Sequence, residues 1–158
     1  MIAAPQQFMT EAVRLAREGM RQNAGGPFGA VIVRGGEIIA RAWNEVLSSN
    51  DPTAHAEILA IRRACAALGK FSLENCDIYA SSEPCPMCLA AIFWARLRAV
   101  YYANTRHDAA AIGFDDAMFY DQLAQDRAGR LVPMTQVSRE EGLKVFAEWR
   151  EKPDKLLY

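Results

Sequence analysis

The sequence predicts an α/β protein, a three-layer α/β/α sandwich around one mixed β-sheet. Runs of apolar residues at helical spacing alternate with short β-rich runs, which is typical of helices packed on a sheet. The chain has 158 residues, the length of one domain, and shows no internal repeat or interdomain linker. Hydrophobic residues make up 51% and charged residues 23% of it, the balance of a folded protein rather than a disordered one.

Local patterns place each element in turn. Apolar side chains at helical spacing predict the helices, and β-branched and aromatic runs predict the strands. Gly35-Gly36 marks a hairpin turn, Gly69 stops a helix, and Pro84 with Pro86 marks the loop into the next helix. In chain order, we expect a helix over 7–20, strands over 28–33 and 37–44, a helix over 54–68, a strand over 77–81, a helix entered at 84–86 and ending at 96, a strand over 99–103, a helix over 116–125, a strand over 131–137 and a helix over 139–150.

Charge and composition restrict the class of function. Eighteen basic and nineteen acidic residues give a net charge of −1, which disfavours a polynucleotide ligand because nucleic-acid-binding proteins usually carry a basic surface. The longest stretches without Asp, Glu, Lys or Arg have 12 residues, fewer than the roughly 18 of a membrane span. We therefore expect no membrane segment. The N-terminus has no basic region followed by an apolar run, so we expect a cytoplasmic, reducing location.

Two short segments carry the chemistry: Thr53-Ala54-His55-Ala56-Glu57 and Glu83-Pro84-Cys85-Pro86-Met87-Cys88, each opening a predicted helix. Cys85 and Cys88 lie three residues apart in a first helical turn, so both sulfurs project to one side, where free N–H groups favour thiolates. A neutral imidazole from His55 completes a ligand set that zinc prefers. Because structural zinc sites normally have four protein ligands, three ligands predict a catalytic zinc with a position left for water.

Other residues near these segments fit other roles. Cys65 and Cys76 lack paired spacing, and packing suits each better than service as a fourth ligand. Glu57 lies two residues past His55, so the two side chains do not share a helix face and are not expected to bind one ion. Taken alone, Glu57 fits a first-turn residue stabilised by the helix dipole. Beside both halves of a zinc site, it fits proton transfer between water and a leaving amine.

The two segments match the H-x-E…P-C-x-x-C signature of zinc-dependent nucleobase deaminases. The chain thus resembles the cytidine deaminase-like superfamily, and over nearly its whole length it is similar to the compact bacterial guanine deaminases. Further matching segments are Gly26-Pro27-Phe28-Gly29-Ala30-Val31, Asn50-Asp51-Pro52-Thr53 and Gly113-Phe114-Asp115-Asp116. The resemblance implies hydrolytic deamination of guanine to xanthine and ammonia, with one Zn²⁺ per chain as cofactor. It places the metal ligands on His55, Cys85 and Cys88 and the proton shuttle on Glu57.

The resemblance also implies substrate-binding residues. It assigns Asn44 and Asp116 to the purine, although taken alone Asn44 fits a turn and Asp116 fits a helix N-cap. The backbone N–H of Ala56 is expected to help hold the reacting oxygen. Phe28 and Trp94 are candidates for packing against the flat base, with an aromatic core role as the alternative.

The C-terminal end predicts a lid. Leu156-Leu157-Tyr158 is apolar for a solvated tail, and similar proteins use this end to close the active site. We expect one domain over residues 1–158, in which residues 139–158 form a C-terminal helix and tail that closes the site, with Tyr158 as a candidate substrate contact. We also expect a homodimer, and the resemblance favours exchange of this segment between the two chains. Such a lid would favour a free base over a nucleoside or RNA.

Two other functions stay open. A tRNA-specific adenosine deaminase of the same superfamily shares the zinc signature. Residues 121–158, however, contain seven basic and seven acidic residues, so no basic tail for tRNA is evident. A non-enzymatic, zinc-stabilised interaction module is the second alternative, and it would require a fourth protein ligand or an inert metal.

Overall fold

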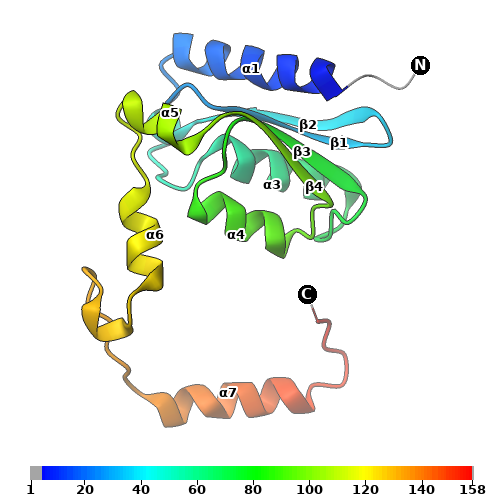
Figure 1. Ribbon diagram of the computed structural model, residues 1–158. Helices are drawn as coiled ribbons and strands as arrows, with labels where there is room; N and C mark the ends of the chain where they lie inside the picture. Colours follow the sequence, from blue (N-terminus) through cyan, green and yellow to red (C-terminus); the bar gives the residue numbers. More distant parts are fainter. Residues whose placement is uncertain (1–4, 158) are drawn as a thin grey trace. The chain divides into compact units, whose positions relative to one another are not determined.

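The computed structural model describes residues 5–157 (Figure 1). They form two compact units that divide after Asp116. Within the described residues, no helix combines the length and the apolar character needed to cross a bilayer.

The first unit contains a four-stranded mixed sheet with strand order β2-β1-β3-β4. β1 pairs antiparallel with β2 and with β3, whereas β3 and β4 run parallel. Gly35 and Gly36 both have positive φ in the β1–β2 turn, a conformation that costs glycine little. The strands are β1 (Gly29–Arg34), β2 (Glu37–Trp43), β3 (Cys76–Ser82) and β4 (Ala99–Asn104).

Helices cover both faces of this sheet. α1 (Pro5–Arg21) packs on one face, and α3 (Ala56–Leu68) and α4 (Pro86–Trp94) lie on the other (Figure 1). The predicted three-layer α/β fold is confirmed. The fold places the first residues of α3 and α4 close to the end of β3, where the candidate site lies.

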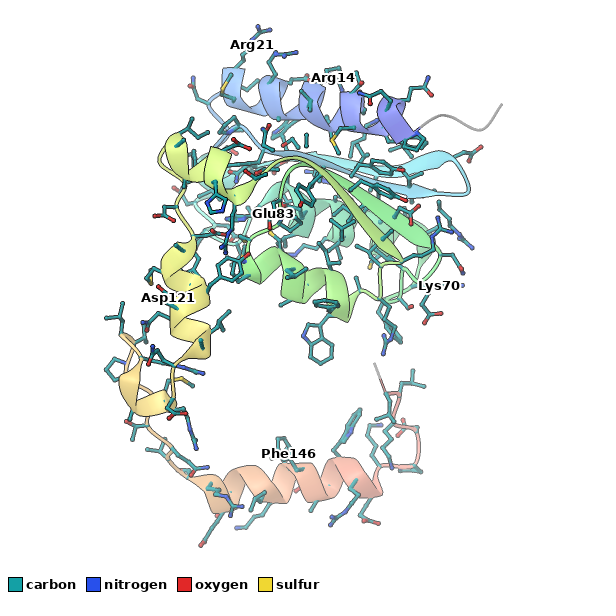
Figure 2. All side chains as sticks on the ribbon, in the orientation of Figure 1. Arg14, Arg21, Lys70, Glu83, Asp121 and Phe146 are labelled. Carbon is teal, nitrogen blue, oxygen red and sulfur yellow. The ribbon has the colours of Figure 1, made fainter. Side chains whose placement is uncertain are left out.

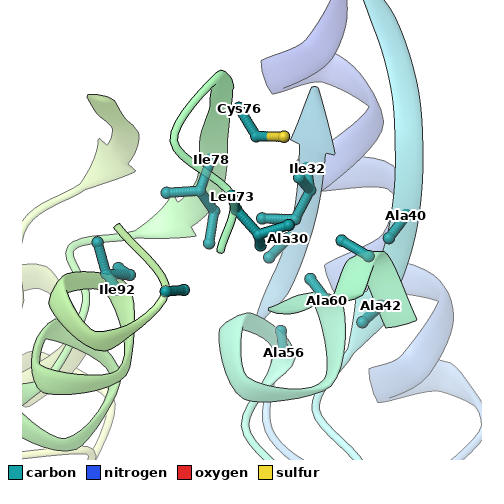
Figure 3. Close-up of a cluster of buried hydrophobic side chains, with 12 residues drawn as sticks. Ala30, Ile32, Ala40, Ala42, Ala56, Ala60, Leu73, Cys76, Ile78 and Ile92 are labelled. Atoms are coloured by element: carbon teal, nitrogen blue, oxygen red, sulfur yellow. The ribbon is translucent and has the colours of Figure 1, made fainter. Parts of the chain in front are cut away.

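Each face has its own core. On the α3 and α4 face, Ile32 and Ile78 of the sheet pack with Leu73 and Ile92 (Figure 3). Alanines on the buried side of α3 let this helix lie close to the strands. On the α1 face, the buried side chains are Phe8, Leu15, Val31, Val33 and Tyr79. A side chain at Gly29 would overlap the main-chain carbonyl of Ala12, so β1 approaches α1 at a distance that only glycine permits.

Two short helices were not predicted, and one predicted strand is wrong. α2 (Val46–Ser49) and α5 (Arg106–Ala111) interrupt segments that we expected to be loops. Residues 131–137 are not a strand: Pro133 lacks an N–H donor for strand pairing, and the described strands β1 to β4 pair only with one another. The second unit instead contains α6 (Ala117–Ala124), a short 3₁₀ helix (Arg127–Gly129) and α7 (Arg139–Glu151).

Candidate functional site

Two helix N-termini bring the candidate metal ligands together. His55 is the N-cap residue of α3, and Cys85 is the N-cap residue of α4. Both have an extended backbone conformation, and neither makes a side-chain capping hydrogen bond. Ser, Thr, Asp and Asn are the residues that normally cap helices. The imidazole and the thiol therefore remain available to bind a metal ion.

The three side chains fit one tetrahedral metal ion. Nδ1 of His55 lies 3.6 Å from Sγ of Cys85 and 3.5 Å from Sγ of Cys88. All three ligand atoms lie within 4.8 Å of one another. Zinc bonds of about 2.3 Å to sulfur and 2.0–2.1 Å to nitrogen, at a tetrahedral angle, separate S and N by about 3.6 Å. The observed separations agree with this value and indicate Nδ1 as the imidazole donor.

The pKa values of the two thiols shift in opposite directions. The pKa of Cys85 is lowered to about 4, first because the thiol of Cys88 donates a hydrogen bond to it and then because of His55. The pKa of Cys88 is raised because its proton forms that bond and because its sulfur is buried. The hydrogen bond with Cys85 raises the pKa of His55. A divalent cation replaces such protons when thiolates and a neutral imidazole bind it.

Glu57 lies beside these ligands, at the second position of α3. Its side chain is only 7% exposed. Burial raises the pKa of its carboxyl, and the negative charge of Cys85 adds to this effect, whereas His55 opposes it. A buried carboxyl with a raised pKa next to a metal site is suited to accept and return protons.

Asn44 directly follows the last residue of β2 and is buried. Its Oδ1 accepts a hydrogen bond of 3.1 Å from the backbone N–H of Val46, so the side chain forms the turn that starts α2. A Cβ at Gly25 would overlap this oxygen, which explains the glycine there. The N–H of Glu45 donates to the carbonyl of Ala54, which connects this turn to the segment before His55.

Phe28 and Asp116 also lie on this side of the molecule. The ring of Phe28 meets that of Phe114 edge to face, with centroids 4.9 Å apart. Asp116 is half-buried, and its pKa is raised by burial and by the negative charge of Cys85, whereas Arg106 lowers it. Phe114 was not predicted as a site residue, although an aromatic residue directly before two acidic residues could have indicated it.

One predicted residue, Trp94, is not brought to this group. Trp94 ends α4, whereas Cys88 lies in its first turn. Six residues of helix separate the two by about 9 Å along the axis, and the Trp94 side chain is 67% exposed. Tyr158 lies outside the described residues.

Fold and ligand geometry together define a zinc-dependent deaminase. The family described as the cytidine and deoxycytidylate deaminase zinc-binding region matches residues 3–104, and the chain belongs to it. The chain is 51% identical over 151 residues to the guanine deaminase of Bacillus subtilis, which covers 96% of this chain and 97% of that protein. An X-ray structure of guanine deaminase from Bacillus subtilis has a TM-score of 0.96 and 49% identity, with 99% of both chains covered.

A second group of relatives matches a shorter part of the chain. The tRNA-specific adenosine deaminase of Agrobacterium fabrum is 54% identical over 76 residues, which cover 48% of this chain and 50% of that protein. Its similarity is thus confined to about half of each protein. Zinc is the cofactor of the family, and the donor set of this chain fits that metal.

Substitution of Cys88 tests the metal site. Cys88→Ala leaves two of the three side chains, and we expect the purified variant to contain less than about a tenth of an equivalent of zinc, since fewer ligands bind far more weakly. Elemental analysis after dialysis measures this content. Cys65→Ala is the matched control and should retain one zinc per chain. A full equivalent in Cys88→Ala would contradict the assignment.

Proposed function

We propose that this chain is a guanine deaminase, which hydrolyses free guanine to xanthine and ammonia. The observation that carries the proposal is the 51% identity with a guanine deaminase along 96% of the chain, residues of the second unit included. The similarity to the tRNA-specific enzyme extends over only 48% of the chain. The even balance of charge along residues 121–158 also favours a small substrate over RNA.

His55, Cys85 and Cys88 are the proposed zinc ligands. Zinc, when bound, supplies a Lewis acid that lowers the pKa of water to about 7. Glu57 is the proposed proton shuttle. It accepts a proton from the water that attacks C2 of guanine and passes this proton to a ring nitrogen. It then accepts the second proton from the new C2 hydroxyl and gives it to the amino group, which leaves as ammonia while the C2 oxygen becomes the carbonyl of xanthine. Its burial beside the ligands supports this role, because the carboxyl accepts a proton more readily there than in water.

Four residues are proposed to orient the purine. Asn44 and Asp116 offer an amide and a carboxylate to the polar edges of the base, and Phe28 packs against its plane. The backbone N–H of Ala56 is the first of α3 and has no acceptor within the helix, so it is placed to donate to the reacting oxygen. Trp94 stays a weaker candidate, because it lies at the opposite end of α4 from Cys85.

A homodimer is the proposed assembly, with residues 139–158 closing an active site, in a single functional domain over residues 1–158. Each unit by itself leaves large apolar side chains exposed, which supports a partner surface. They include Phe93, Ile112, Val145, Phe146, Leu156 and Leu157. We also propose that the enzyme works in the cytoplasm, because all four cysteines are free thiols in the structure.

Glu57→Gln separates catalysis from metal binding. The amide cannot shuttle protons, so we expect kcat on guanine to fall by about 10²- to 10⁴-fold while one zinc per chain remains. Steady-state kinetics with elemental analysis of the same sample measure both quantities. Near-normal kcat would remove Glu57 from the mechanism.

A substrate panel tests the function itself. Ammonia release is measured with guanine, guanosine, adenine, cytidine and an unmodified tRNA at equal concentrations. We expect guanine to be the best substrate and the tRNA to be unchanged, because the family relation over the full length favours the guanine enzyme. Inosine formation in tRNA with guanine untouched would overturn the proposal.

Deletion of residues 156–158 tests the lid. A lid excludes water and bulky substrates, so its loss should lower kcat/KM on guanine at least about 10-fold and relax rejection of guanosine, with zinc retained. Ultracentrifugation of the same samples reports whether the full chain is a dimer. If the shortened chain matches the full chain on both substrates, the tail is not a lid.

A further inference from the structure

We propose that Glu83 is a positioning residue for the purine-binding side of the site. Its carboxylate accepts a hydrogen bond from the backbone at the start of α5, and α5 in turn carries the segment with Phe114 and Asp116. The inference rests on the proposed guanine deaminase function. The expected consequence of losing this hydrogen bond is a higher KM for guanine.

Glu83 joins the metal-binding loop to the end of β4 and to the start of α5, with one hydrogen bond to each. It lies between β3 and α4, two residues before Cys85, and is half-buried (Figure 2). Its N–H donates to the carbonyl of Asn104 at 2.8 Å. Its Oε2 accepts from the backbone N–H of Arg106 at 3.0 Å. The residue after it is Pro84, which restricts Glu83 to extended conformations and so limits where its side chain can reach.

Glu83 bonds the first turn of a short helix to the loop before α4. α5 has only six residues, too few to be stable without tertiary contacts. Thr105 and Asp108 cap it by reciprocal hydrogen bonds within the helix. The N–H of Arg106 is bonded instead to a carboxylate from another loop. A carboxylate at this end also interacts favourably with the helix dipole.

The other end of α5 leads directly to the proposed purine contacts. The chain turns at Gly113, which has a φ of +97°. The N–H groups of Gly113 and Phe114 donate to carbonyls of α5, each at 3.0 Å. The ring of Phe114 packs on Phe28, and the carbonyl of Phe28 accepts a hydrogen bond of 2.9 Å from the N–H of Asn44.

These contacts connect Glu83 to the proposed purine-binding residues through α5. If the start of α5 moves, Phe114 and Asp116 move with it, and the contact of Phe114 with Phe28 then displaces Phe28 and Asn44. The metal ligands belong to the starts of α3 and α4, and the main-chain bond from Glu83 to Asn104 beside them does not depend on the Glu83 side chain. Loss of the Glu83 bond should therefore weaken binding of the base and leave the metal in place.

Two matched pairs of variants test this bond from its two sides. Glu83→Ala removes the acceptor, whereas Glu83→Gln retains a side-chain oxygen. Arg106→Pro removes the donor, and proline is well tolerated at the first position of a helix. Arg106→Ala removes the same side chain but keeps the N–H. Each holoenzyme is assayed for zinc content, for kcat and KM on guanine, and for hydrogen exchange of the amides of residues 112–116.

Glu83→Ala should raise KM about 10-fold or more, since hydrogen bonds to charged groups are the stronger ones. We expect kcat to change less than about 3-fold and zinc to remain at one equivalent, with faster exchange over residues 112–116. Arg106→Pro should raise KM above that of Arg106→Ala by a similar factor, and Glu83→Gln should restore most of the wild-type KM.

Three results would overturn the inference: an unchanged KM in Glu83→Ala, equal KM values in the two Arg106 variants, or loss of zinc in Glu83→Ala. If Glu83→Ala does not fold, the Arg106 pair decides. If the wild-type chain does not act on guanine at all, the proposed function fails. The exchange rates of residues 112–116 then still decide whether Glu83 holds this segment.

Discussion

The structure depends on the meeting of two helix N-termini that present non-capping residues. At the start of α3 and of α4, His55 and Cys85 occupy positions where a capping side chain would normally stabilise the first turn. Replacing a good capping residue by one that does not cap lowers the stability of a helix by about 1 kcal/mol. In place of capping side chains lies a cluster of an imidazole and two sulfurs at two helix N-termini, where the helix dipoles favour a thiolate. The hydrogen bond from Cys88, followed by that from His55, lowers the pKa of Cys85 to about 4.

The sheet makes this meeting possible. β3 is buried along its whole length and ends directly before the loop that carries Cys85. The alanines of α3 allow a close approach to β1 and β2, which fixes the start of the helix and hence His55. The proposed purine-binding side depends on turns and on the six-residue α5, whose first N–H donates to Glu83.

Much of this was predictable from the sequence, for physical reasons. The zinc ligands follow from local spacing, since a C-x-x-C at a helix start and a His at another are visible without the fold, and the structure places them together. Long amphipathic helices such as α1 were predicted because their apolar residues recur at helical spacing.

α5 was missed because six residues give no periodicity, although its Thr105 and Asp108 form a capping box. The strand over 131–137 was wrongly predicted because β-rich composition does not supply a pairing partner. The bond between Glu83 and Arg106 joins residues 23 apart and leaves no local pattern.

The most direct test of the central claim is the zinc K-edge X-ray absorption spectrum of the wild-type holoenzyme. The account predicts two sulfur atoms at about 2.3 Å and two lighter atoms at about 2.0–2.1 Å around one zinc. A shell with three or four sulfur atoms would require Cys65 or Cys76 as a ligand and would contradict the account. A shell with one sulfur atom would also contradict it, because Cys85 and Cys88 would then not bind the metal together.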